Sequence, residues 1–95
     1  MSKPPLLSVT IKKPEQIIFD GYATSVTSVS NRGKFDVLAF HANFIGLIEE
    51  TIVLGQEGKP PLQFPIKTGV IKVRQNSVKI ILGIETNKQL PTKGI

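Results

Sequence analysis

The sequence of 95 residues lacks cysteine and contains only one histidine, His41. Without cysteine the chain can form no disulfide, no thiolate metal site and no cysteine nucleophile. One histidine cannot make a multi-histidine metal site, and a serine–histidine–aspartate triad would depend entirely on His41. The sequence therefore predicts no catalytic residue, no cofactor site and no metal site, and it favours a protein that is not an enzyme.

Long hydrophobic runs are also missing. The apolar runs 37–40 and 80–82 are far shorter than the ~20 residues that a membrane-spanning helix needs. Residues 1–8 contain neither the apolar core nor the small-residue cleavage site of a signal peptide. We expect a chain that is made in the cytoplasm and does not itself cross a membrane.

Negative charge is scarce, with 7 Asp and Glu against 12 Lys and Arg and a net charge of +5. The basic residues are spread over the start, one late segment and the end of the chain, so they form no continuous basic arm. Aromatic residues make up 6% of the chain and do not lie among the lysines, as they would on a surface that stacks nucleic-acid bases. The distribution favours ordinary solubility over binding to nucleic acid.

The length fits one domain, and its apolar residues recur with the period of two that is typical of β-strands. In the first strand, Val9 and Ile11 alternate with polar residues until Pro14. The segment 16–19 then leads to Asp20-Gly21, which predicts a tight hairpin turn there.

The clearest predicted hairpin lies late in the chain, with a two-residue turn at Gln75-Asn76. If Arg74 pairs with Ser77, Val73 faces Val78 and the apolar side chains of both strands share one face. The lysines on the opposite face are then most simply solvated.

Further short strands are expected in the middle of the chain, at 22–30, 34–39, 44–49, 51–54 and 62–67. Many short strands without a helical pattern predict an all-β sandwich or barrel. We expect a sandwich domain over residues 1–86, with a surface loop at 55–61 and a flexible tail at 87–95.

Four segments in order resemble the epsilon subunit of F-type ATP synthases, which is called delta in mitochondria. The segment 9–21 has the strand, Pro-Glu, Phe, acidic residue and Gly of the start of that family, and 23–27 resembles its next strand. The segment 33–42 is similar to its Gly-Glu-Phe-Gly-Val-Leu-Pro-Gly-His-Ala motif. The segment 68–80 resembles its Gly-Gly-x-Leu-Glu-Val-x-x-Asn-x-Val-x-Ile hairpin.

The resemblance implies the N-terminal domain of that family, a two-sheet β-sandwich of about ten short strands. It also implies a non-catalytic rotor part of the central stalk, which packs on the gamma subunit, rests on the c-ring and supports the coupling of ion translocation to ATP synthesis. The implied location is the cytoplasmic side of the inner or plasma membrane, where the subunit is peripheral and membrane-associated only through the complex.

The resemblance also implies contact residues. Phe40, His41 and Ala42 match the His loop that meets partners, and Arg32 and Lys34 match the turn that meets the c-ring. By the same resemblance, the remaining two contact residues, which would face gamma, are Lys13 and Gly46.

The chain departs from the family pattern at several turns. Ala39-Phe40 replaces Pro-Gly, the segment 49–51 stands where Lys-Pro-Gly is usual, and Lys34 reverses the charge of a glutamate. A c-ring contact at Lys34 would therefore need a compensating charge on the partner. The remaining residues are too few for the two C-terminal helices of the family, so the resemblance does not carry over the inhibitory, ATP-sensing role of those helices.

Two alternatives remain open. A free-standing basic β-sandwich or barrel could bind an anionic ligand such as single-stranded nucleic acid through Lys67, Lys72, Arg74 and Lys79. A small hydrolase that uses His41 as a base is the weaker one, because no carboxylate lies at a telling spacing from that histidine.

Overall fold

The computed structural model describes residues 5–40 and 43–83, and this part of the chain is all-β. Seven strands follow one another in the chain: β1 (Leu7–Lys13), β2 (Gln16–Ala23), β3 (Ser25–Ser30), β4 (Gly33–Leu38), β5 (Phe44–Gly55), β6 (Leu62–Arg74) and β7 (Ser77–Leu82). Within the described residues there is no helix of the length and hydropathy that a membrane crossing requires. The predicted tail, 87–95, lies outside them.

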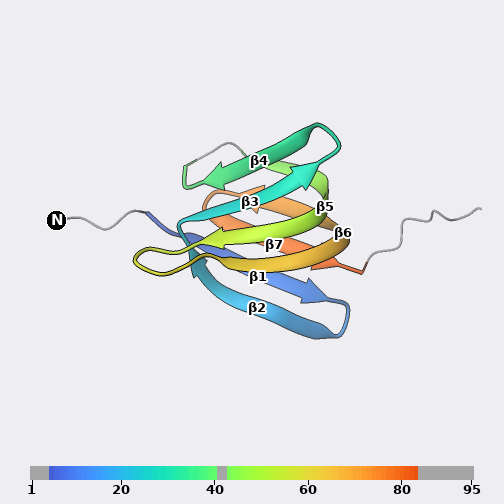
Figure 1. Cartoon of the computed structure of the whole chain (residues 1–95), viewed down its shortest axis with the longest axis horizontal. Coiled ribbons are helices and arrows are strands. Elements are labelled where there is room, and N and C mark those ends of the chain that lie inside the picture. The colour runs from blue at the N-terminus through green and yellow to red at the C-terminus, as the bar shows by residue number, and fades with distance from the viewer. Residues whose placement is uncertain (1–4, 41–42, 84–95) are drawn as a thin grey trace, which may run out of the picture.

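All seven strands belong to one sheet with the order β2-β1-β7-β6-β5-β3-β4, and this sheet folds back on itself (Figure 1). The two long strands make this possible because their two halves have different neighbours. In β6, residues 69–74 pair with β7, whereas residues 62–65 have only β5 beside them. In β5, residues 49–55 pair with β3, whereas residues 44–48 have only β6 beside them.

The fold thus has two layers. The first layer contains β2, β1, β7 and the adjoining halves of β6 and β5; the second contains the other halves with β3 and β4. The predicted all-β, two-sheet class is confirmed. The described residues form seven strands, whereas about ten were expected. The segments 44–49 and 51–54 are halves of β5, and 62–67 lies within β6, so these segments are parts of long bent strands.

The bend lies where the register between β5 and β6 shifts. Glu49 pairs with Thr68 and Thr51 with Pro65, so one residue of β5 faces two of β6. The inward side of β6 changes accordingly from even to odd positions, with Ile66 half-buried before the bend and Gly69 buried after it. Such a bulge bends and twists a strand, which here redirects both strands into the second layer.

A buried serine satisfies the backbone at this bend. Ser28, on β3, is fully buried, and its hydroxyl donates a 2.7 Å hydrogen bond to the carbonyl oxygen of Thr51. The β3–β5 register shifts just beyond this position, and Pro65, which lies opposite Thr51, has no N–H to donate. The Ser28 hydroxyl therefore supplies a donor where the ladder is interrupted.

The core fills the space between the layers with aliphatic side chains. Its members are Leu7, Val9, Ile11, Ala23, Val26, Val37, Ile48, Ile52, Leu54, Ile71, Val73, Val78, Ile80 and Leu82.

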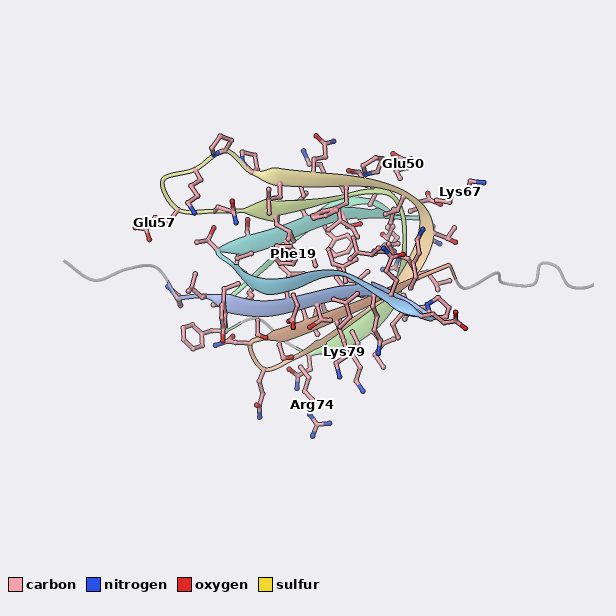
Figure 2. All side chains as sticks on the ribbon, turned by 90° about the horizontal axis from the view of Figure 1, so that it is seen from below. Phe19, Glu50, Glu57, Lys67, Arg74 and Lys79 are labelled. Carbon is pink, nitrogen blue, oxygen red and sulfur yellow. The ribbon has the colours of Figure 1, made fainter. Side chains whose placement is uncertain are left out.

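Two edge-to-face phenylalanine pairs join the layers at their sides. Phe19 of β2 lies 6.0 Å from Phe64 of β6, and Phe35 of β4 lies 6.0 Å from Phe44 of β5, between ring centroids. In Figure 2, Phe19 lies between the layers.

One predicted hairpin is confirmed and the other is wrong. The late hairpin turns at Gln75-Asn76, and Arg74 pairs with Ser77 and Val73 with Val78 as predicted. Asp20-Gly21 is not a turn but the middle of β2, paired with residues 9–10 of β1; the turn lies at residues 14–15.

Gly21 has a packing role instead of a turn role. A Cβ at Gly21 would lie only 3.1 Å from the Cζ atom of the Phe19 ring, so the ring covers the space that a side chain would need. A glycine inside a strand marks such a close approach as well as a turn, and the sequence motif alone does not separate the two.

We predict that Ser28→Ala lowers the free energy of unfolding by about 1–2 kcal/mol, because the Thr51 carbonyl loses its buried donor. Urea unfolding measures this change. Ser77→Ala is the matched control, since Ser77 is exposed at the start of β7, and it should change stability by less than about 0.5 kcal/mol. Equal stability of Ser28→Ala and the unmodified chain would contradict the role given to this hydroxyl.

Candidate functional site

A groove of about 690 Å³ runs between the β3–β4 turn and the first half of β5. One wall carries Arg32 and Lys34, and the other carries Gly46 and its neighbours on β5. Three of the seven predicted contact residues therefore lie on one groove, although Gly46 is 12 or more residues distant from the two cations in sequence.

The basic wall is held by a short turn. The backbone N–H of Arg32 donates a 3.1 Å hydrogen bond to the hydroxyl of Ser30, and Gly33 has a φ of 116°, which a glycine adopts freely. Arg32 and Lys34 are both exposed, and within the described residues neither forms an ion pair. Two cations are thus free to meet an anionic group of a ligand or partner.

The other wall is apolar on both sides of its strand. Ile45 and Leu47 project outward and are 69% and 64% exposed, whereas Phe44 leans on Phe35. A Cβ at Gly46 would lie 3.9 Å from the nearest side-chain atom, of Ile71, so the groove has room at this position. Large exposed aliphatic side chains beside each other are typical of protein interaction surfaces.

Phe40 lies at the opposite end of the sandwich, beside the β6–β7 turn. Its backbone N–H donates a 2.8 Å hydrogen bond to the side-chain Oδ1 of Asn76, and the N–H of Gln75 donates a 2.7 Å hydrogen bond to Oδ1 of Asn43. The first bond joins the end of β4 to the late hairpin, and the second joins the start of β5 to it. Phe40 has a φ of 67° and its side chain is 78% exposed.

A bulky side chain in this left-handed conformation is strained, and here it is not buried in compensation. Phe40 occupies the place where the family pattern has the glycine of Pro-Gly. The backbone keeps a conformation that suits glycine while the side chain offers an aromatic ring to the solvent, which suggests a contact role rather than a packing role.

The other predicted contact residues do not join either group. Lys13 ends β1, where it pairs with Gln16, and it does not line the groove. His41 and Ala42 lie outside the described residues, and their contact role and the hydrolase alternative stay predictions. Within residues 5–40 and 43–83, no group of histidine, aspartate and glutamate side chains could hold a metal ion.

The residues of the anionic-ligand alternative are divided between two places. Lys72 and Lys79 pair directly across β6 and β7, and Arg74 lies two residues along β6. All three are exposed on the outer face of the first layer, as the hairpin pattern predicted. Lys67 lies at the bend beside Glu50, on the other side of the molecule (Figure 2).

Comparison with known proteins identifies the family. Residues 6–83 match the family model described as the ATP synthase delta/epsilon chain, beta-sandwich domain. The chain belongs to this family. The ATP synthase epsilon chain of Sulfurimonas denitrificans is 32% identical over 77 residues, which cover 80% of this chain and 59% of that relative.

Two solved structures share the fold. One is a mitochondrial ATP synthase of Euglena gracilis, OSCP/F1/c-ring, with a TM-score of 0.76 and 21% identity over 86% of this chain and 53% of that chain. The other is the central stalk and c-ring of the Tetrahymena thermophila mitochondrial ATP synthase, with a TM-score of 0.67 and 16% identity over 98% of this chain and 78% of that chain. The chain spans about three fifths of the length of the Sulfurimonas relative.

Sequence reasoning missed the apolar pair Ile45 and Leu47 and the two asparagines, Asn43 and Asn76, that fix the Phe40 end. A signal for the first was present, because residues 44–48 are uncharged and carry large apolar side chains at both odd and even positions. In a strand with one solvated face, apolar residues would alternate with polar ones, which they do not in this segment.

We predict that Phe40→Gly is at least as stable as the unmodified chain, because relief of the strain of about 1–2 kcal/mol offsets the backbone entropy of glycine. Phe40→Val should lose about 1–2 kcal/mol, since a β-branched residue tolerates positive φ least. Thermal and urea unfolding of both variants measure the difference. A clear loss of stability in Phe40→Gly would mean that the ring packs in the fold instead of serving contact.

Proposed function

We propose that this domain is a non-catalytic central-stalk subunit of an F-type ATP synthase, which links the gamma subunit to the c-ring and supports the coupling of ion translocation to ATP synthesis. The observation that carries the proposal is the family match over residues 6–83. The fold shared with the Euglena and Tetrahymena structures supports it.

The physical role we propose is mechanical. A two-layer sandwich resists shear because its strands are hydrogen-bonded and its core is close-packed. Such a block can fix the distance between two partners while its surfaces supply the contacts. Its action would lie in interface area and needs no cofactor.

The contacts we propose follow the two ends of the domain. Arg32 and Lys34 would meet the polar loops of the c-ring, and Gly46 and Lys13 would face gamma. Phe40, with His41 and Ala42, would form a second contact at the opposite end. Exposure of Phe40, Arg32 and Lys34 supports these assignments.

The proposed location is peripheral, on the cytoplasmic side of the inner or plasma membrane, with membrane association only through the complex. We propose residues 1–86 as the folded unit. No nucleic-acid partner is proposed.

One observation keeps the anionic-ligand alternative as a second candidate. Two lysines directly opposite each other repel, and Lys72 and Lys79 hold that arrangement beside Arg74 without an ion pair among the described residues. Binding of an oligonucleotide that weakens steeply with salt, in a chain that does not co-purify with gamma and the c-ring, would favour this candidate.

We predict that Arg32→Glu combined with Lys34→Glu weakens association with the c-ring at least about tenfold, because both cations would be replaced by charges that repel the proposed anionic partner. Thermal unfolding should change little, since neither side chain is buried or paired within the described residues. Co-purification of the tagged chain with gamma and the c-ring measures the effect.

The control is Lys59→Glu, which reverses one charge, as each substitution of the double variant does, at an exposed position of the loop after β5. It should assemble normally. Normal assembly of the double variant would remove Arg32 and Lys34 from the contact, and failure of the unmodified chain to co-purify would remove the proposed function.

A further inference from the structure

The folded sheet has four strand edges without a neighbour in the described part of the chain: β2, β4, the first half of β6 and the first half of β5. An exposed strand edge presents free N–H and C=O groups and invites pairing with another chain. Proteins that stay monomeric protect such edges with charges, prolines or bulges. The four edges of this domain can be compared on that basis.

Three of the edges carry these protections. The β2 edge has a bulge at Ile18 and the charge of Asp20. The β4 edge is a strand of 6 residues that includes Lys34 and Asp36. The free half of β6 carries Pro65, Lys67 and a bulge.

The fourth edge, residues 44–48 of β5, has none of them. It is uncharged and without proline, its ladder to β6 is regular from Phe44 to Glu49, and Ile45 and Leu47 beside it are largely exposed. No backbone hydrogen bond outside the ladders involves these residues within the described chain. The groove of about 690 Å³ runs along this edge, so there is space next to it.

We infer that this groove receives an extended segment of a partner protein, which adds to the edge of β5 as a further strand. The segment has apolar side chains at alternate positions, which pack on the half-buried floor of the groove near Gly46 and Phe35. It has a carboxylate at the end that reaches Arg32 and Lys34. Backbone hydrogen bonds to the edge give affinity, and the side-chain pockets give specificity.

The charges favour such a partner over a second copy of this chain. In an antiparallel edge-to-edge dimer, residues 44–48 of the other copy would enter the groove. The carboxylate next to them, that of Glu49, would then lie at the Phe44 end of the edge, whereas Lys34 lies near the Glu49 end, across Val29. A dimer would therefore leave both cations unpaired in a groove that was partly closed to water, which is unfavourable.

The inference rests on the proposed function and deepens its gamma contact at Gly46. Under it, the cations Arg32 and Lys34 serve gamma rather than the c-ring, so gamma is the partner tested. Hydrogen exchange of the full chain, alone and with purified gamma, measures strand addition directly. We expect slower exchange, by at least tenfold, for backbone amides within residues 44–48 in the complex. Gamma that binds without slowing these amides would overturn strand addition and leave the proposed function intact.

Gly46→Lys tests the groove itself. The position has room for a side chain, so the variant should fold, but an inward-pointing lysine at an edge opposes strand pairing. We expect its affinity for gamma to fall at least tenfold, while Ser8→Lys, which adds a lysine at an exposed strand position outside the groove, keeps it. Equal binding by both variants would contradict the inference.

If gamma does not bind, a synthetic ten-residue peptide serves as the probe. It alternates valine and threonine and ends in two glutamates, and its control ends in two lysines. Binding of the glutamate peptide that Gly46→Lys abolishes would support the groove as a strand site for another partner. Failure of both peptides to bind, or a dimer in sedimentation that Gly46→Lys dissolves, would overturn it.

Discussion

The shared bend of β5 and β6 is the constraint on which the rest of the molecule depends. A single sheet of seven strands has two faces and would leave one apolar face in water. At Glu50 and the residues opposite it, the register shifts by one residue, and both strands leave the first layer for the second. The apolar faces of the two layers then meet, and the core closes without a disulfide.

The same bend decides which edges are open. Because each long strand is split between two layers, half of β5 and half of β6 become edge strands, facing β4 and β2 in the other layer. A phenylalanine pair bridges each of these sides, Phe35 with Phe44 and Phe19 with Phe64. The Phe19 side is protected against pairing by proline, charge and bulges, whereas the Phe44 side keeps an unprotected edge next to the groove. Because only the Phe44 side keeps an unprotected edge, the fold itself determines on which side the proposed partner contact lies.

Much of the fold could be predicted from the sequence because local patterns determine it. The late hairpin follows from alternation and turn residues, and the pairing of Val73 with Val78 was correct in register. The bend was not predicted, because residues 49–51 and 66–68 look like a break between strands, and only the pairing across strands shows that they continue. Asp20-Gly21 was misplaced for a related reason, since its glycine serves the Phe19 ring.

The candidate site was predicted in part. The resemblance supplied Arg32, Lys34 and Gly46, and the fold brings them to one groove, although the distance between them in sequence gives no such hint. The resemblance named Phe40 but could not give its conformation, because the side chain that bonds its backbone, Asn76, lies 36 residues along the chain. Exposure of Ile45 and Leu47 depends on which edge is left open, which the bend decides.

A cryo-electron microscopy map of the assembled ATP synthase that contains this chain tests the central claim most directly. We predict that the sandwich lies at the foot of the central stalk, with the groove of Arg32, Lys34 and Gly46 turned toward a partner subunit and an added strand along residues 44–48. A complex that lacks this chain, or one in which that groove faces open solvent, would contradict it.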